Sequence, residues 1–173
     1  MTNLIIGNFI ALLCSLSMVY CGLIKEKKKI IYIQTIEKLF SILSNLILGG
    51  ITGAIMNAVG YIRNFLCYKN KLKQKEKIIL IIISIVLSLS LNNIGFIGFL
   101  PLIATVLYTL LMDTPDIVAF KKLVISTTFL WVIYELYIKS YSSAIFHITN
   151  IVSNYISIYE LHIYQGKKLQ ESH

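Results

Sequence analysis

Two polar stripes inside apolar sequence are the first candidates for chemistry. Each recurs at positions i, i+3, i+4 and i+7, which places its members on one face of a helix. Amide and imidazole groups on such a face bind either a polar solute or a neighbouring helix. We therefore predict that each stripe contacts a solute or cross-links helices. The first stripe consists of Asn57, Gly60, Tyr61 and Asn64, and the second of His147, Asn150, Ile151 and Asn154.

A third apolar run carries Trp131 and, one helical turn later, Glu135. Tryptophan usually lies at the membrane interface, so a ring in mid-run either packs in the core or stacks on a sugar or heterocycle. A carboxylate in lipid is costly and indicates function by default, with His147 or Tyr134 as its partner. The alternative is that Glu135 lies near the outer interface and is hydrated. We include Trp131 and Glu135 among the candidate solute-binding residues.

Three charged residues in apolar runs are better explained by structure. Lys38 can extend toward the interface, and Glu37 can pair with Arg63 on the next helix. We therefore expect Glu37 and Arg63 to form a structural ion pair rather than a solute site.

The three cysteines do not indicate catalysis, a metal or a cofactor. Cys14, Cys21 and Cys67 lie in apolar runs, are odd in number, and lack CxxC or Cys/His ligand spacing. We interpret them as packing thiols. The carboxylates are dispersed, and nucleophilic or metal-assisted chemistry needs them clustered or needs a nucleophile beside a base. We therefore expect no enzyme and no cofactor.

The composition indicates an integral membrane protein. Of 173 residues, 57% are hydrophobic and 14% are charged, whereas soluble domains carry about 25% charged residues. The net charge is +8, but the lysines lie between apolar runs, which is the positive-inside pattern of membrane proteins and not a nucleic-acid-binding face. The bilayer is the expected partner, a homo-oligomer is compatible with the sequence, and nucleic acid is not expected.

Apolar runs separated by charged residues, Gly or Asn predict seven transmembrane helices, each of about 20 residues. The N-terminal run lacks the positive n-region of a signal peptide, so we expect a retained helix. The shortest run contains Pro101, which requires a neighbouring helix or a hydroxyl such as that of Thr105 to satisfy the freed carbonyl. The expected spans are 4–24, 30–48, 51–68, 78–93, 96–112, 122–140 and 142–164.

The loop cations predict the orientation. The lysines after the first, third, fifth and seventh spans fall on one side, and the opposite side has essentially Lys139 alone. The positive-inside rule then places the N-terminus outside and the C-terminus in the cytoplasm. The clusters are Lys25 and Lys27 to Lys29; Lys69, Lys71, Lys73, Lys75 and Lys77; Lys121 and Lys122; and Lys167 and Lys168.

An internal repeat predicts the architecture. A shift of 90 positions aligns Ala54, Ile55 and Asn64 with Ala144, Ile145 and Asn154, and Asn57 with His147. The same shift aligns spans one to three with spans five to seven. We expect one transmembrane domain over 1–173, an all-α fold of two parallel three-helix repeats (4–68 and 96–164), a linker helix (78–93) and a short cytoplasmic tail (165–173).

The stretch from Leu48 to Asn57, LGGITGAIMN, followed by Arg63 and Asn64, resembles the signature of the YgjV-type bacterial inner-membrane proteins. Gln34 and the pair Leu100-Pro101 fit as well. The resemblance implies the bacterial cytoplasmic membrane, and a fold similar to the SWEET sugar facilitators and PnuC vitamin transporters. In those sugar facilitators, asparagines on spans three and seven contact the solute, in places similar to Asn57 and His147. They use prolines in both repeats, whereas the repeat partner of Pro101 is Ala11.

These observations favour a transporter or facilitator for a small polar solute, with a midplane site between the repeats. At about 1.5 Å per residue from the flanking charges, Asn57, Trp131 and His147 fall near the middle of a core about 30 Å thick. The alternative is a membrane scaffold or sensor that uses the same fold without transport.

Overall fold

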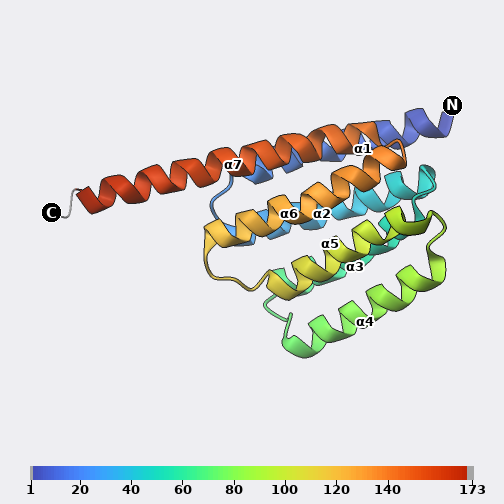
Figure 1. Cartoon of the computed structure of the whole chain (residues 1–173), viewed down its shortest axis with the longest axis horizontal. Coiled ribbons are helices and arrows are strands. Elements are labelled where there is room, and N and C mark those ends of the chain that lie inside the picture. The colour runs from blue at the N-terminus through green and yellow to red at the C-terminus, as the bar shows by residue number, and fades with distance from the viewer. Residues whose placement is uncertain (1, 171–173) are drawn as a thin grey trace.

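The computed structural model describes residues 2–170, of which residues 13–19 and 164–170 are described by backbone alone. All its regular secondary structure is helical, which confirms the expected all-α class for this part of the chain. The long helices lie side by side along one direction (Figure 1). They are α1 (Thr2–Leu23), α2 (Lys27–Ile47), α3 (Ile51–Tyr68), α4 (Gln74–Leu91), α5 (Leu100–Leu111), α6 (Ile117–Tyr137) and α7 (Tyr141–Gln170), with a 3-10 helix η1 (Gly95–Phe99) before α5.

Length and composition single out two helices as long and apolar enough to cross a membrane in the described residues. These are α2 and α6, each of 21 residues. Shorter apolar stretches cover Thr2–Leu12 and Gly95–Leu111. Helix α3 carries Asn57, Arg63 and Asn64, which lower its mean hydropathy, and α4 begins with charged residues. Seven spans therefore stay a prediction.

The helices form a bundle in which α4 lies at one edge. Helix α1 packs against α2 and α7, α6 packs against α5 and α7, and α3 packs against α2, α4 and α5. The connections after α1, α3 and α5 lie at one end of the bundle, and those after α2, α4 and α6 lie at the other (Figure 1). The lysine clusters that follow α1, α3 and α5 are therefore gathered at the same end.

The turns after α2 and α6 have the same geometry, 90 residues apart. Gly49 and Lys139 both adopt the left-handed conformation, with φ of 79° and 62°. In each turn the following residue donates its N–H to a carbonyl five residues back, from Gly50 to Asn45 and from Ser140 to Glu135, at 2.8 Å in both cases. Helix α6 also starts 90 residues after α2, and α7 starts 90 residues after α3. These two pairs of helix starts thus follow the alignment found in the sequence, whereas α5 starts 98 residues after α1 (100 − 2).

Pro101 lies at the start of α5 and not in the middle of a helix, which corrects the expectation of a mid-span proline. The chain forms η1 first, and Pro101 then occupies the first turn of α5. The N–H groups of a first turn have no partner within the helix, so a proline there removes no hydrogen bond and its fixed φ suits the helix start. Pro101 therefore leaves no helix carbonyl without its N–H donor, and Thr105 is not needed to hydrogen-bond one.

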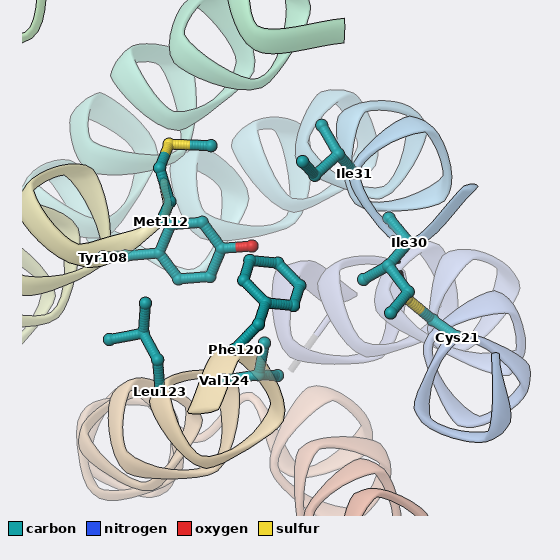
Figure 2. Packing of buried hydrophobic residues seen from close by; sticks show 8 residues of the cluster. All are labelled: Cys21, Ile30, Ile31, Tyr108, Met112, Phe120, Leu123 and Val124. Atoms are coloured by element: carbon teal, nitrogen blue, oxygen red, sulfur yellow. Dashed lines mark hydrogen bonds between the residues drawn. The ribbon is translucent and has the colours of Figure 1, made fainter. Parts of the chain in front are cut away.

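Two apolar clusters lie in the interior of the described part of the chain. In the first, the Phe120 ring packs edge-on below the Tyr108 ring at 5.9 Å, and side chains from α1, α2, α5 and α6 converge around them (Figure 2). The second cluster contains Met56, Leu100, Ala104, Trp131, Tyr134 and Ile138. Buried threonines separate the two clusters along both α5 and α6: Thr105 on α5, and Thr127 and Thr128 on α6.

The distribution of apolar and polar side chains between the surface and the interior is the reverse of that in a soluble protein. Many large apolar side chains face outward, which in water would be an aggregation hazard, while the interior holds many buried polar and charged groups. The outward residues on α4 are Ile78, Ile79, Ile82, Ile83, Ile85, Val86, Leu89 and Leu91, and those on α7 are Ile145, Ile148, Val152, Tyr155, Ile156, Tyr159 and Ile163. Lipid around the helices accounts for this distribution. Of the cysteines, Cys21 and Cys67 are free, and the side chain of Cys14 lies outside the described residues.

Candidate functional site

A small polar cavity lies at the centre of the bundle, with walls from α2, α3, α5, α6 and α7. It has a volume of about 40 Å³, measured as the space that the centre of a water molecule can reach. Buried cavities of this polarity accommodate water or polar ligands, because polar walls offer hydrogen bonds. The lining residues are Gln34, Glu37, Lys38, Met56, Gly60, Arg63, Ala104, Thr105, Tyr108, Val124, Thr127, Thr128, Trp131 and His147.

Lys38 connects α2 to two of the candidate residues. Its Nζ donates a hydrogen bond of 2.8 Å to Oδ1 of Asn57 and lies 5.0 Å from the centre of the Trp131 ring, a cation–π distance. The same ammonium is 3.5 Å from Oε2 of Glu37. Lys38 therefore points into the bundle instead of extending to the interface, because a carboxylate, an amide and an aromatic face replace its hydration.

Glu135 and His147 form a buried pair between α6 and α7. Oε2 of Glu135 and Nδ1 of His147 are 3.0 Å apart, and both side chains are at most 9% exposed. The two atoms are close enough for an ion pair, although their alignment is poor for a hydrogen bond. Of the two partners that the sequence left open for Glu135, His147 makes this contact, and Glu135 is buried instead of hydrated at an interface.

The ionic contacts of Glu37 and Arg63 differ from the pair expected between them. Glu37 contacts Lys38 and accepts a hydrogen bond from Oγ of Ser41, one turn along α2. The Arg63 guanidinium instead reaches α5, where Nη1 lies 3.4 Å from Oγ1 of Thr109 and its Cζ stacks 4.3 Å from the centre of the Tyr108 ring. The neighbouring Lys38 supplies the nearer cation for Glu37.

Asn57 and Asn64 each accept hydrogen bonds from a basic side chain through the side-chain oxygen. Oδ1 of Asn57 accepts from Lys38, and Oδ1 of Asn64 accepts from Nε and Nη2 of Arg63 at 3.0 and 2.9 Å. The Nδ2 groups of both asparagines are buried without a hydrogen-bond partner among the described residues. Such a donor is costly to bury, so the first stripe combines a positioning role with unused hydrogen-bonding capacity.

The second stripe divides between two places. His147 lines the central cavity, whereas Asn150 and Asn154 lie in a separate polar cluster with Lys121 near the end of α1. There the Lys121 ammonium donates to the carbonyl of Gly22 at 2.8 Å and to Oδ1 of Asn154 at 3.4 Å, and Nδ2 of Asn154 donates to the Asn150 carbonyl. Lys121 is fully buried, which corrects its assignment as a loop cation. Lys121 thus binds one carbonyl at the end of α1, that of Gly22, as cations commonly do at helix C-termini.

Several residues of the cavity were missed by sequence reasoning. Tyr108 donates a hydrogen bond of 2.7 Å to Oε1 of Gln34, which joins α5 to α2, and Thr127 and Thr128 line the cavity on α6. Gly60, a member of the first stripe, also lies in the wall. A charged residue inside an apolar run, as Lys38 is, was the available signal. In the described part of the chain, three or more His, Cys, Asp or Glu side chains do not come together in an arrangement suited to a metal ion.

Comparison with known proteins identifies the family. Searches of curated proteins and of solved structures gave no significant match. The sequence profile of a family described as a bacterial inner membrane protein, YgjV, matches residues 5–165, which is nearly the whole chain. The chain therefore belongs to the YgjV family of bacterial inner membrane proteins.

Proposed function

We propose that this protein is a seven-span carrier for a small polar solute. Helices α1 to α3 and α5 to α7 form its two halves, α4 links them, and the solute site is the central cavity. The N-terminus is outside and the lysine-rich end of the bundle is cytoplasmic. No catalytic step is part of the proposal.

Two features support the division into halves. The turns at Gly49 and Lys139 share backbone geometry at a separation of 90 residues. Corresponding helix pairs also pack in both halves: α1 with α2 corresponds to α5 with α6, and α1 with α7 corresponds to α5 with α3, although α1 packs far more extensively against α7 than α5 does against α3. A two-fold relation of this kind is common among transporters, where the site lies between the repeats.

The central cavity is the observation that carries the proposal. Its wall combines residues of the first half (Glu37, Lys38 and Arg63) with residues of the second half (Trp131 and His147). Charged side chains within a membrane are expensive and are retained for function in most cases. A rocking motion of the halves would expose such a site to each side in turn.

One observation favours the alternative, a sensor or scaffold without transport. The cavity is small, and its ionic groups contact one another at Lys38–Glu37 and Glu135–His147. A bundle with these contacts is stable with no solute. The resemblance to sugar facilitators and vitamin transporters stays a prediction.

Uptake into proteoliposomes distinguishes the two functions. The purified full-length protein is reconstituted and tested with labelled small solutes, including a neutral polyol and a carboxylate. We expect saturable uptake that falls at least tenfold in Trp131→Ala, because the site loses one wall. The matched control is Phe129→Ala, which removes an exposed ring from the same helix. Absence of saturable uptake for every solute of the panel would favour the sensor or scaffold.

A further inference from the structure

We propose that the solute is a small monocarboxylate and that Arg63 is its charge partner. This inference rests on the proposed carrier function and assigns the chemical class of its substrate. It depends on three properties of the cavity: the uncompensated charge of Arg63, the space beside Gly60, and the volume.

The described contacts of Arg63 are all with uncharged groups. The guanidinium bonds to Oδ1 of Asn64, to Oγ1 of Thr109 and to the carbonyl of Thr105, and it stacks on the ring of Tyr108. The two contacts of Nη1 are long, at 3.4 and 3.5 Å. Nη2 uses one N–H, toward Asn64 at 2.9 Å. Because a guanidinium has five N–H donors, at least one donor of Nη2 is unused among the described residues.

Gly60 lies between the aliphatic part of the Lys38 side chain and this donor. A methyl group added at Gly60 would lie 3.6 Å from Nη2 of Arg63 and 3.3 and 3.4 Å from Cδ and Cε of Lys38. The absence of a side chain at Gly60 therefore leaves space for about one atom, such as a carboxylate oxygen, between the methylene groups of Lys38 and the Arg63 guanidinium. A carboxylate in this space accepts a charge-assisted hydrogen bond from Arg63, the planar donor best suited to it.

The other charges of the cavity are paired. Glu37 contacts Lys38, and Glu135 contacts His147. The titratable groups near Arg63 are Tyr108, whose ring it stacks on, and Cys67, and both are uncharged as a phenol and a thiol. Helix α1, which packs against α7, contributes no charged residue to the described interior. When the Glu135–His147 pair carries no net charge, Arg63 therefore gives the charged residues of the cavity a net charge of +1. A single negative charge on the solute balances this charge.

The space in the cavity suits a small solute. One water needs about 10–15 Å³ of this type of volume, so about 40 Å³ accommodates roughly three waters or a carboxylate of two to three carbons. Acetate is the appropriate probe, and acetamide is its neutral equivalent in size and shape.

Binding of acetate to the purified full-length protein tests the inference. Titration calorimetry in lipid nanodiscs at pH 6, with chloride adjusted to constant ionic strength, gives Kd for wild type and variants. We expect acetate to bind and acetamide not to bind. Arg63→Gln should raise the Kd for acetate about tenfold or more, as expected for loss of a charged hydrogen bond.

Two further variants make the test specific. Gly60→Ala fills the space without changing charge and favours the helix, and it should also raise Kd about tenfold or more. Lys121→Gln removes a buried cation outside the cavity, and distant sites act independently, so Kd should change by less than about twofold. If Arg63→Gln fails to fold, Gly60→Ala carries the test.

The inference is overturned if acetamide binds as tightly as acetate, if wild type does not bind acetate, or if Gly60→Ala binds acetate as wild type does. Uptake assays separate this failure from failure of the carrier function. Saturable uptake of a neutral polyol without uptake of acetate would retain the carrier and reject the carboxylate. Saturable uptake of neither would reject the carrier, while binding of acetate would then support a sensor for the same anion.

Discussion

Gly49 and Lys139 occupy equivalent turns 90 residues apart and share a left-handed backbone, with φ of 79° and 62°. Glycine adopts this conformation without cost, whereas a residue with a Cβ is strained in it by about 1–2 kcal/mol. The second turn therefore contains strain that the first does not.

This difference predicts opposite effects of substitution on stability. Lys139→Gly should raise the free energy of unfolding by up to about 1 kcal/mol, and Gly49→Ala should lower it by about 1–2 kcal/mol. Thermal unfolding in a fixed detergent measures both. Gly95→Ala is a useful comparison because its φ is also positive, at 65°, outside the two related turns. Equal stability of Gly49→Ala and wild type would contradict the assigned turn geometry.

The helices were predictable because apolar runs bounded by charged residues have few alternatives in a chain of this composition. Helix α3 begins and ends at the expected residues, and α2 is displaced by only a few at its start. A partner for Glu135 was also predictable, since a buried carboxylate needs one, but the choice of His147 over Tyr134 was not.

Side-chain direction was much less predictable. Lys38 and Lys121 have long flexible side chains that can extend outward or inward, and the choice depends on acceptors from helices distant in sequence. Asn57 provides the acceptor for Lys38, and the Gly22 carbonyl provides it for Lys121. Helical periodicity placed Asn154 on the same face as His147, but it contained no information that a different neighbour would cover that part of the face.

Asn57 should contribute to stability as well as to uptake. Asn57→Ala removes the acceptor of the Lys38 ammonium, and a buried group left without its partner costs about 1–3 kcal/mol. Asn57→Asp retains an acceptor at this position, so it should preserve more stability than the alanine variant. Thermal unfolding measures the difference, with the exposed Asn93→Ala as a control that should resemble wild type. A neutral effect of Asn57→Ala would contradict the buried contact with Lys38.

The proposed orientation predicts which ends of the bundle are accessible from outside the cell. In a variant without native cysteines, Lys71→Cys should react with an impermeant maleimide only after permeabilisation, because the lysine-rich end is cytoplasmic under the positive-inside rule. Asn93→Cys, at the opposite end, should react in intact cells. Both positions are exposed, so low reactivity cannot be attributed to burial within the protein. Reaction of Lys71→Cys from outside would reject the orientation.

The Glu135–His147 pair predicts that carboxylate binding depends on pH. Histidine ordinarily titrates near pH 6.5, and one additional proton on the pair changes the net charge of Lys38, Arg63, Glu37, Glu135 and His147 from zero to +1. Proton binding and anion binding should therefore favour each other, since their coupling is reciprocal.

Acetate should consequently bind more tightly as the pH falls from about 7.5 to 5.5, with a change of at most about tenfold per pH unit for one linked proton. His147→Asn places at this position the residue that the first half has at position 57, and it should flatten the dependence because it removes the titrating ring. His162→Asn is the matched control, since it removes an exposed histidine further along α7 and should leave the slope unchanged. The measurement is the Kd for acetate by calorimetry across this pH range. If log Kd depends on pH as steeply in His147→Asn as in wild type, or if wild type binds acetate more weakly at low pH, the Glu135–His147 pair is not the group whose protonation is linked to binding.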